Sequence, residues 1–199
     1  MPIPSRPTDY QRDAAKLSQA AFVTANCFIR RDVLAELGGF DETFTMAWRE
    51  DSDLHFRLIK RNARIVHAGK AIVVHPVRTT SWGISVSQQR KALFNALLYK
   101  KHPDLYRRHI QLWPPFRYYA AVFALGISVF GLSLRLFPLS LLATGLWLFI
   151  TVQICTSRLR GNCAKLEHVL EMIITSALIP PIAVFWRIAG AIRFKVLFI

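Results

Sequence analysis

Five acidic residues lie within thirteen positions of a strongly basic chain, just before a stretch with helical apolar spacing. They are Asp41, Glu42, Glu50, Asp51 and Asp53. A positioned carboxylate can accept a proton as a general base. Acids at this place can also cap a helix and complement its dipole. The residue types alone therefore leave a catalytic and a purely structural interpretation open.

The order of these residues resembles the acceptor-side half of family 2 glycosyltransferases. Residues 38–42 read Gly-Gly-Phe-Asp-Glu, and residues 50–57 read Glu-Asp-x-Asp-Leu-x-x-Arg. The resemblance covers roughly residues 20–110. It implies a GT-A fold, which is an α/β Rossmann-like domain. It also implies an inverting transfer of a sugar from a nucleotide-sugar donor to an acceptor hydroxyl.

The resemblance assigns a role to four of the five acids. In the family, the aspartate of the Glu-Asp pair is the catalytic base, which is Asp51 here. Inverting transfer needs a carboxylate that takes the hydroxyl proton while the acceptor oxygen attacks the anomeric carbon. Glu50, Asp53 and Asp41 are then expected to be acceptor-side carboxylates. Gly39 allows the tight turn beside them.

Two further residues are candidate substrate contacts. Asn26 lies in an apolar stretch that leads into the acceptor site of the family, although an isolated asparagine is also common in turns. Trp82 follows the polar run Thr79-Thr80-Ser81 and can stack on a sugar from a loop that closes over substrate. A loop tryptophan also serves as a packing anchor. Both roles stay open for both residues.

A divalent metal is expected from the resemblance. In related GT-A enzymes, a histidine at about this distance after the base completes a metal site begun by an Asp-x-Asp motif, and His75 matches that place. Imidazole suits Mn²⁺ and tolerates Mg²⁺, which stabilises the departing diphosphate. No Asp-x-Asp precedes Asp51. The nucleotide-binding half is therefore expected to be missing, or to be a separate N-terminal half.

Helices and strands are expected to alternate through residues 1–112, the soluble region, which is typical of an α/β domain. Apolar spacing, caps and stop signals predict helices at residues 13–21, 33–37, 54–61, 88–99 and 104–111. Short β-prone runs predict strands at residues 22–29, 64–68 and 71–77.

Charge and apolar residues are segregated along the chain. The whole sequence has 26 basic and 12 acidic residues, a net charge of +14 and 53% hydrophobic residues. Such a charge can indicate nucleic acid, an anionic membrane surface or anionic substrates. The second part of the chain is mostly apolar, which favours the membrane. No nucleic-acid recognition motif is present, so nucleic acid is not an expected partner.

We therefore predict two regions. Residues 1–112 form a partial GT-A domain, and residues 113–199 form a membrane region. Within the latter, 116–134 and 137–156 each have about the twenty apolar residues that a bilayer core requires. The stretch 167–199 contains two adjacent prolines and is predicted to be a broken interfacial helix, with a third span as the alternative.

The compartment is predicted from cysteines, the N-terminus and basic residues. Cys27, Cys155 and Cys163 have neither disulfide nor zinc spacing, which favours a reducing compartment. The N-terminus lacks the apolar core of a signal peptide. Arg158, Arg160 and other basic residues after the second span place that side in the cytoplasm. We expect a multi-pass protein of the inner or plasma membrane with a glycan or lipid-linked acceptor, or else a non-catalytic anchor or interaction module derived from such an enzyme.

Overall fold

The computed structural model describes residues 4–198, and their backbone is helical or irregular throughout. The predicted α/β fold is wrong for this part of the chain. Residues 22–29 are irregular apart from the 3-10 helix η2 (Thr24–Asn26), and residues 64–68 and 71–77 have no regular structure. A strand needs a neighbouring strand to pair its N–H and C=O groups. The described residues provide no such neighbour, so these β-prone runs form no sheet.

Short helices make up the soluble region. Besides η2 they are α1 (Asp9–Ala15), η1 (Lys16–Gln19), α2 (Arg31–Glu36), α3 (Glu50–Lys60), α4 (Ile84–Ser87), η3 (Gln88–Lys91), α5 (Ala92–Lys101) and α6 (Pro103–His109). A capping box between Thr8 and Gln11 begins α1. Pro103 begins α6, where its missing N–H costs no helical bond. All five predicted helical stretches contain helical turns, with shifted ends.

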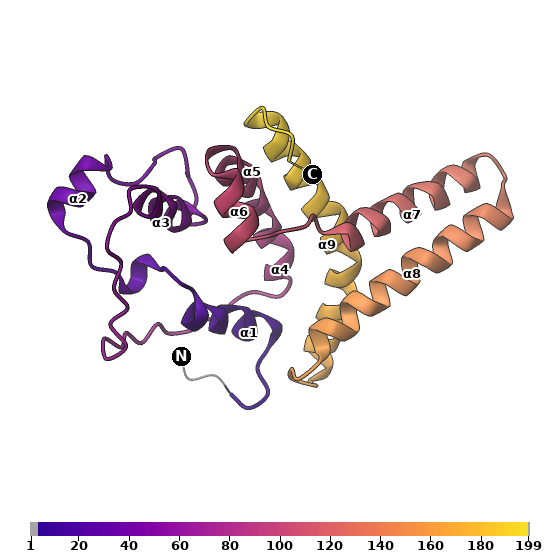
Figure 1. The fold of residues 1–199 in the computed structure, drawn as a ribbon. Coiled ribbons are helices and arrows are strands. Elements are labelled where there is room, and N and C mark those ends of the chain that lie inside the picture. Colours follow the sequence, from indigo (N-terminus) through magenta and orange to yellow (C-terminus); the bar gives the residue numbers. More distant parts are fainter. Residues whose placement is uncertain (1–3, 199) are drawn as a thin grey trace.

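Three longer helices follow: α7 (Phe116–Ser133), α8 (Phe137–Leu159) and α9 (Leu166–Arg193). Each is long and apolar enough to cross a membrane, which supports membrane association. α7 and α8 closely coincide with the two predicted spans and form a hairpin that projects from the other helices (Figure 1). A Cβ on Gly131 would lie 3.2 Å from the backbone nitrogen of Ser140, so glycine permits this close approach.

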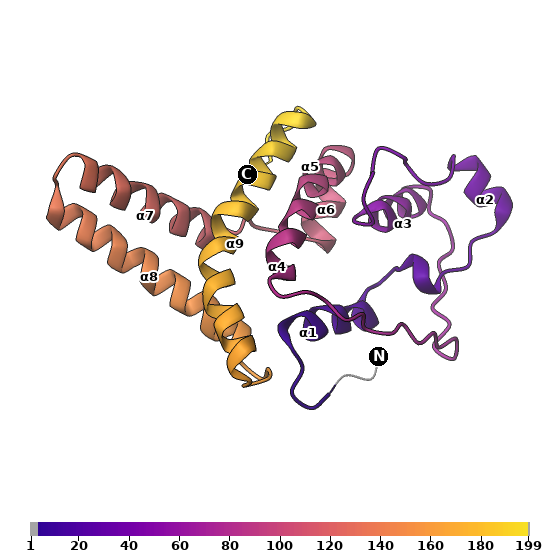
Figure 2. The same ribbon diagram turned by 180° about the vertical axis from the view of Figure 1, so that it is seen from behind.

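α9 continues through Pro180 and Pro181, so the predicted break at the prolines is wrong. Each proline removes one helical N–H donor. Packing on two sides compensates for this loss. α9 contacts α4, η3 and α5 on one side and α7 and α8 on the other. Figures 1 and 2 show it crossing the base of the hairpin, between the hairpin and the soluble helices.

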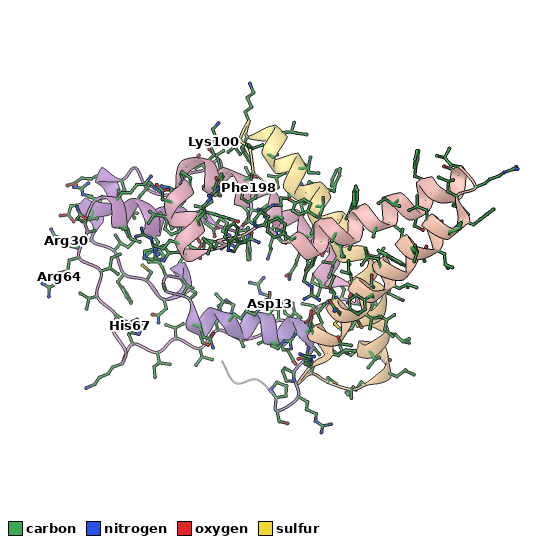
Figure 3. The ribbon with its side chains drawn as sticks, turned by 45° about the vertical axis from the view of Figure 1, so that its right-hand side comes forward. Asp13, Arg30, Arg64, His67, Lys100 and Phe198 are labelled. Carbon is green, nitrogen blue, oxygen red and sulfur yellow. The ribbon has the colours of Figure 1, made fainter. Side chains whose placement is uncertain are left out.

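The main apolar core lies between α3, α5, α6 and the end of the chain. Its buried members include Phe56, Phe94, Leu98, Tyr106 and Phe198. Figure 3 shows Phe198 among the side chains near α5 and α6, whereas Arg30, Arg64 and His67 lie along the outer edge of the irregular region. The core thus joins the acidic segment to the last helix.

Candidate functional site

The acidic cluster reaches the N-terminus of α3 through a residue in the left-handed conformation, Arg49, whose φ is 76°. The Nε of Arg49 donates to Oδ1 of Asn95 at 2.7 Å, and the indole Nε1 of Trp48 donates to the same oxygen at 3.1 Å. The guanidinium also lies 4.6 Å from the centre of the Trp48 ring. Asn95, on α5, therefore fixes the backbone immediately before Glu50 and Asp51.

Asp51 is half-buried in the first turn of α3. Its Oδ1 accepts hydrogen bonds from the backbone N of Ser52 at 2.6 Å and from the Ser52 hydroxyl at 3.2 Å. Within residues 4–198, Asp51 belongs to no ion pair, and no side chain caps α3. The N-cap residue Arg49 makes no side-chain cap bond, whereas Glu50, Asp51 and Asp53 all lie in the first turn, where acids complement the helix dipole. A carboxylate in this setting is able to accept a proton.

Glu50, the neighbour of Asp51, has a different environment. Its Oε2 is buried and has no hydrogen-bond partner among the described residues. Burial, together with the negative charge of Asp51, raises the pKa of Glu50 above its ordinary value. Burial without a partner favours the neutral form of a carboxyl group. The Glu-Asp pair thus consists of one acid shifted toward the protonated form and one without an ionic partner.

Asp53 is fully buried and is the centre of an ion-pair network. Its Oδ1 lies 2.5 Å from Nζ of Lys101 and 2.9 Å from Nε2 of His102, and its Oδ2 accepts from Nε of Arg57 at 2.8 Å. Burial alone would raise the pKa of Asp53, but these partners lower it. Because both oxygens are occupied internally, Asp53 holds α3 to the start of α6.

The network extends to the diglycine turn. Arg57 donates to the carbonyl oxygens of Leu37 at 2.7 Å and Gly39 at 2.8 Å. Lys101 also pairs with Asp41 at 2.6 Å. Partial burial would raise the pKa of Asp41, but the Lys101 hydrogen bond and neighbouring donors hold it at about 2. Asp41 and Gly39, expected near substrate, are therefore also part of the framework that holds Asp51.

Comparison with known proteins identifies the family of the chain. A family model described as glycosyl transferase family group 2 matches residues 9–187. The chain belongs to glycosyl transferase family group 2. It is therefore a glycosyltransferase, and its family implies a nucleotide-sugar donor and an acceptor. Neither the curated proteins nor the solved structures include a significant match.

Two residues of this transferase that were predicted to contact substrate, Asn26 and Trp82, make contacts outside the acidic cluster. Nδ2 of Asn26 donates to the carbonyl of Ala71 at 3.0 Å, which links two irregular segments. Trp82 is exposed and lines a cavity of about 800 Å³, with mixed polar and apolar walls, between α1, α4 and the start of α9. The backbone N of Gly83 donates to Oε1 of Glu171 at 2.8 Å and ties this loop to α9. The cavity lining includes none of the five acids.

His75, the expected metal ligand, lies on an exposed irregular segment. In the described part of the transferase, no group of three histidine, cysteine or acidic side chains is placed to hold a metal ion. The residues present do not fit a complete metal site. A metal at His75 would need ligands from another segment or another chain.

Sequence reasoning missed Arg158, at the end of α8. Its Nη2 pairs with Asp9 at 2.8 Å and donates to Ser85 at 3.0 Å, and its Nη1 donates to Thr175 at 2.7 Å and Ser176 at 3.2 Å. These bonds join α1, α4, α8 and α9 of the transferase. The signal in the sequence was a basic residue directly after an uncharged span, which indicated orientation only.

Proposed function

We propose that this transferase moves a sugar from a nucleotide-sugar donor to an acceptor hydroxyl with inversion, at the cytoplasmic face of the membrane, with Asp51 as general base. The contrast between the two aspartates of the motif carries the proposal. Asp53 is buried and bonded to Lys101, His102 and Arg57, whereas Asp51 is half-buried and outside any ion pair in residues 4–198. Of these two aspartates, Asp51 is therefore the one placed to take a proton from substrate.

The surrounding residues support this role in distinct ways. The Asp53 network and Asn95 hold the N-terminus of α3 in place, which fixes the direction of the Asp51 carboxylate. Burial raises the pKa of Glu50, which reduces like-charge repulsion beside the base, and its carboxyl group is placed to contact the acceptor. The acceptor hydroxyl would lose its proton to Asp51 as its oxygen attacks the anomeric carbon.

The donor site is proposed to come from a sheet-bearing nucleotide-binding half with an Asp-x-Asp motif. Apolar side chains in the irregular segments are left uncovered: Phe28 is 95% exposed, Ile72 82%, Val66 70% and Val74 69%. Uncovered β-prone backbone is suited to pairing with strands of another domain. That half would complete a metal site with His75, and Mn²⁺ or Mg²⁺ there would stabilise the diphosphate.

The acceptor is proposed to be a glycan or a lipid-linked molecule presented at the membrane surface. Trp82 and its cavity lie beside α8 and α9, which are among the helices able to contact the bilayer. The cavity includes none of the five acids, so Trp82 would contact a part of a long acceptor distant from the hydroxyl at Asp51. The indole of Trp82 offers a flat face for a sugar ring.

The test is co-expression with the nucleotide-binding half of a family member that carries Asp-x-Asp. UDP or GDP release is measured with Mn²⁺ and an acceptor extract. Asp51→Asn is expected to lower the rate by about 10²-fold or more, the usual range for a general base. Asp51→Glu, which keeps the carboxylate, is expected to retain more activity. Normal turnover by Asp51→Asn would show that the base is another group.

A non-catalytic anchor or interaction module is the second candidate. It is favoured by the lack of any sheet or metal cluster within residues 4–198. Titration of UDP-sugars and GDP-sugars with Mn²⁺ into the assembled pair separates the two candidates. Saturable binding that depends on the presence of this chain supports the transferase, and binding that is unchanged by its removal supports the module.

A further inference from the structure

The distribution of residues on α9 is the reverse of that on a helix packed in water. Its buried face includes the polar residues His168, Thr175, Ser176 and Arg187. Its exposed face is an apolar stripe formed by Leu166, Leu170, Ile173, Ile174, Leu178, Phe185, Ile188 and Ile192. Their spacing places these side chains on one side of the helix. An exposed stripe of this length is expected to face lipid.

Composition alone would allow α9 to cross the membrane. It has 28 residues, so it is about 42 Å long at 1.5 Å per residue. A bilayer core is about 30 Å thick. A crossing helix must have its two ends on opposite sides of the membrane. The contacts made by the two ends therefore decide whether it crosses.

The N-terminal end of α9 contacts the soluble region. The backbone N of Cys163, just before the helix, donates to the carbonyl of Pro7 at 2.9 Å. Glu171, in the second turn, accepts from the backbone N of Gly83 at 2.8 Å. This end is therefore on the same side of the membrane as α1 and α4.

The C-terminal end contacts the soluble region as well. Gly190 lies so close to α5 that an added Cβ would be 2.5 Å from the carbonyl oxygen of Leu93. Arg187 donates to Gln111 at 3.1 Å. Beyond the helix, the ring of Phe198 packs 5.5 Å from that of Tyr106, centre to centre. This end is on the side of α5 and α6.

The segment between these contacts runs beside α9. α4, η3 and α5 all pack on the helix, and the views from both sides show them next to it (Figures 1 and 2). They include the basic residues Arg90, Lys91, Lys100 and Lys101. If α9 crossed the bilayer, this charged segment would enter it too, and charged side chains are costly in hydrocarbon.

We propose that α9 lies in the plane of the membrane interface, with its apolar stripe in contact with lipid acyl chains and its opposite, buried face against α4, η3, α5 and the end of α8. Only α7 and α8 then cross, and both ends of α9 are on the side of the soluble region. Lys165, Arg193 and Lys195 flank the stripe and suit anionic lipid headgroups. The proposal does not depend on transferase activity.

Cysteine labelling tests which side each end occupies. In a variant with Cys27, Cys155 and Cys163 replaced by alanine, single cysteines are placed at exposed positions as Lys165→Cys, Arg193→Cys and Arg135→Cys. Sealed vesicles of both orientations are treated with a membrane-impermeant maleimide. Labelling of positions 165 and 193 from one side, and of 135 from the other, is expected. Labelling of 165 and 193 from opposite sides would overturn the proposal.

Depth measurement gives a second, independent readout. Spin labels on Ile173→Cys, Leu178→Cys and Ile188→Cys report depth by the ratio of accessibility to oxygen and to a polar nickel complex. Phe123→Cys, exposed near the middle of α7, is the deep reference. All three α9 positions are expected to lie at one shallow depth. A depth profile with its maximum at position 178, equal to that of 123, would show that α9 crosses. Circular dichroism identifies variants that do not fold.

Discussion

Asp53 offers the sharpest test of the framework at the N-terminus of α3. Asp53→Asn removes the negative charge from three contacts, with Lys101, His102 and Arg57. Removing one partner of a buried ion pair usually costs about 3–5 kcal/mol. Lys101 keeps its pairing with Asp41, and Arg57 keeps two carbonyl acceptors. We therefore expect a loss at the lower end of this range, about 3 kcal/mol.

The free energy of unfolding is measured by urea titration in mild detergent, followed by circular dichroism. Asp51→Asn is the matched control, because it makes the same chemical change two positions away. Asp51 bonds only to Ser52 and is half-buried, so its replacement is expected to cost about 0.5 kcal/mol or less. Activity in the assembled enzyme should show a separate effect, with Asp51→Asn inactive although stable.

The pH dependence adds a signature that a packing defect would not give. Asp53 and Asp41 have folded-state pKa values below those of the unfolded chain, about 2 for Asp41. Their contribution is present above the unfolded pKa, near 3.9, and is lost as pH falls through the folded pKa. The free energy of unfolding of Asp53→Asn should therefore fall less than that of the unchanged protein as pH drops below about 4. Equal costs for Asp53→Asn and Asp51→Asn, with unchanged acid dependence, would refute the reasoning.

Three further predictions concern Glu50, Arg158 and Gly190. The folded-state pKa of Glu50 is raised, so its favourable contribution exists at low pH and is lost as pH rises through that pKa. Glu50→Gln should therefore stabilise the protein at pH 7 by about 0.5–1 kcal/mol and have little effect at pH 4, as measured by urea unfolding. Arg158→Met should lower the free energy of unfolding by about 3 kcal/mol. The double change with Asp9→Asn should lower it by less than the sum of the two single changes, because each single change already removes the same ion pair. Gly190→Ala should lower the free energy of unfolding by about 1–3 kcal/mol, because the added Cβ forces α9 away from the carbonyl of Leu93. Additive costs of the Arg158 and Asp9 changes would contradict the ion pair between them. An unchanged stability of Gly190→Ala would contradict the close approach of α9 to α5.

The helices of the soluble region were predictable because their apolar spacing and stop signals are local. The strands were not. Residues 64–68 and 71–77 have β-prone composition, but strand formation depends on a partner that residues 4–198 do not supply. Pro180 and Pro181 predicted a break in α9, whereas packing of the helix on both sides keeps it continuous.

The candidate site was predicted in part. The motif located the acids and assigned Asp51 as the base by resemblance, and family membership is confirmed, but the buried ion-pair network of Asp53 could not be predicted from sequence. One contact of this network joins Asp53 to His102, which is 49 positions away. Hydrogen bonds across such distances leave no local pattern. The roles of Asp51, Glu50 and His75 toward substrate and metal stay predictions.

The main apolar core is formed by side chains that precede the α7–α8 hairpin in the sequence and by others that follow it. Tyr106 precedes α7 and Phe198 follows α9, yet their rings are in contact. Part of this core is therefore missing until α7, α8 and α9 have been synthesised. A chain that has not reached this point would leave apolar side chains of α5 and α6 uncovered and open to binding by chaperones or attack by proteases.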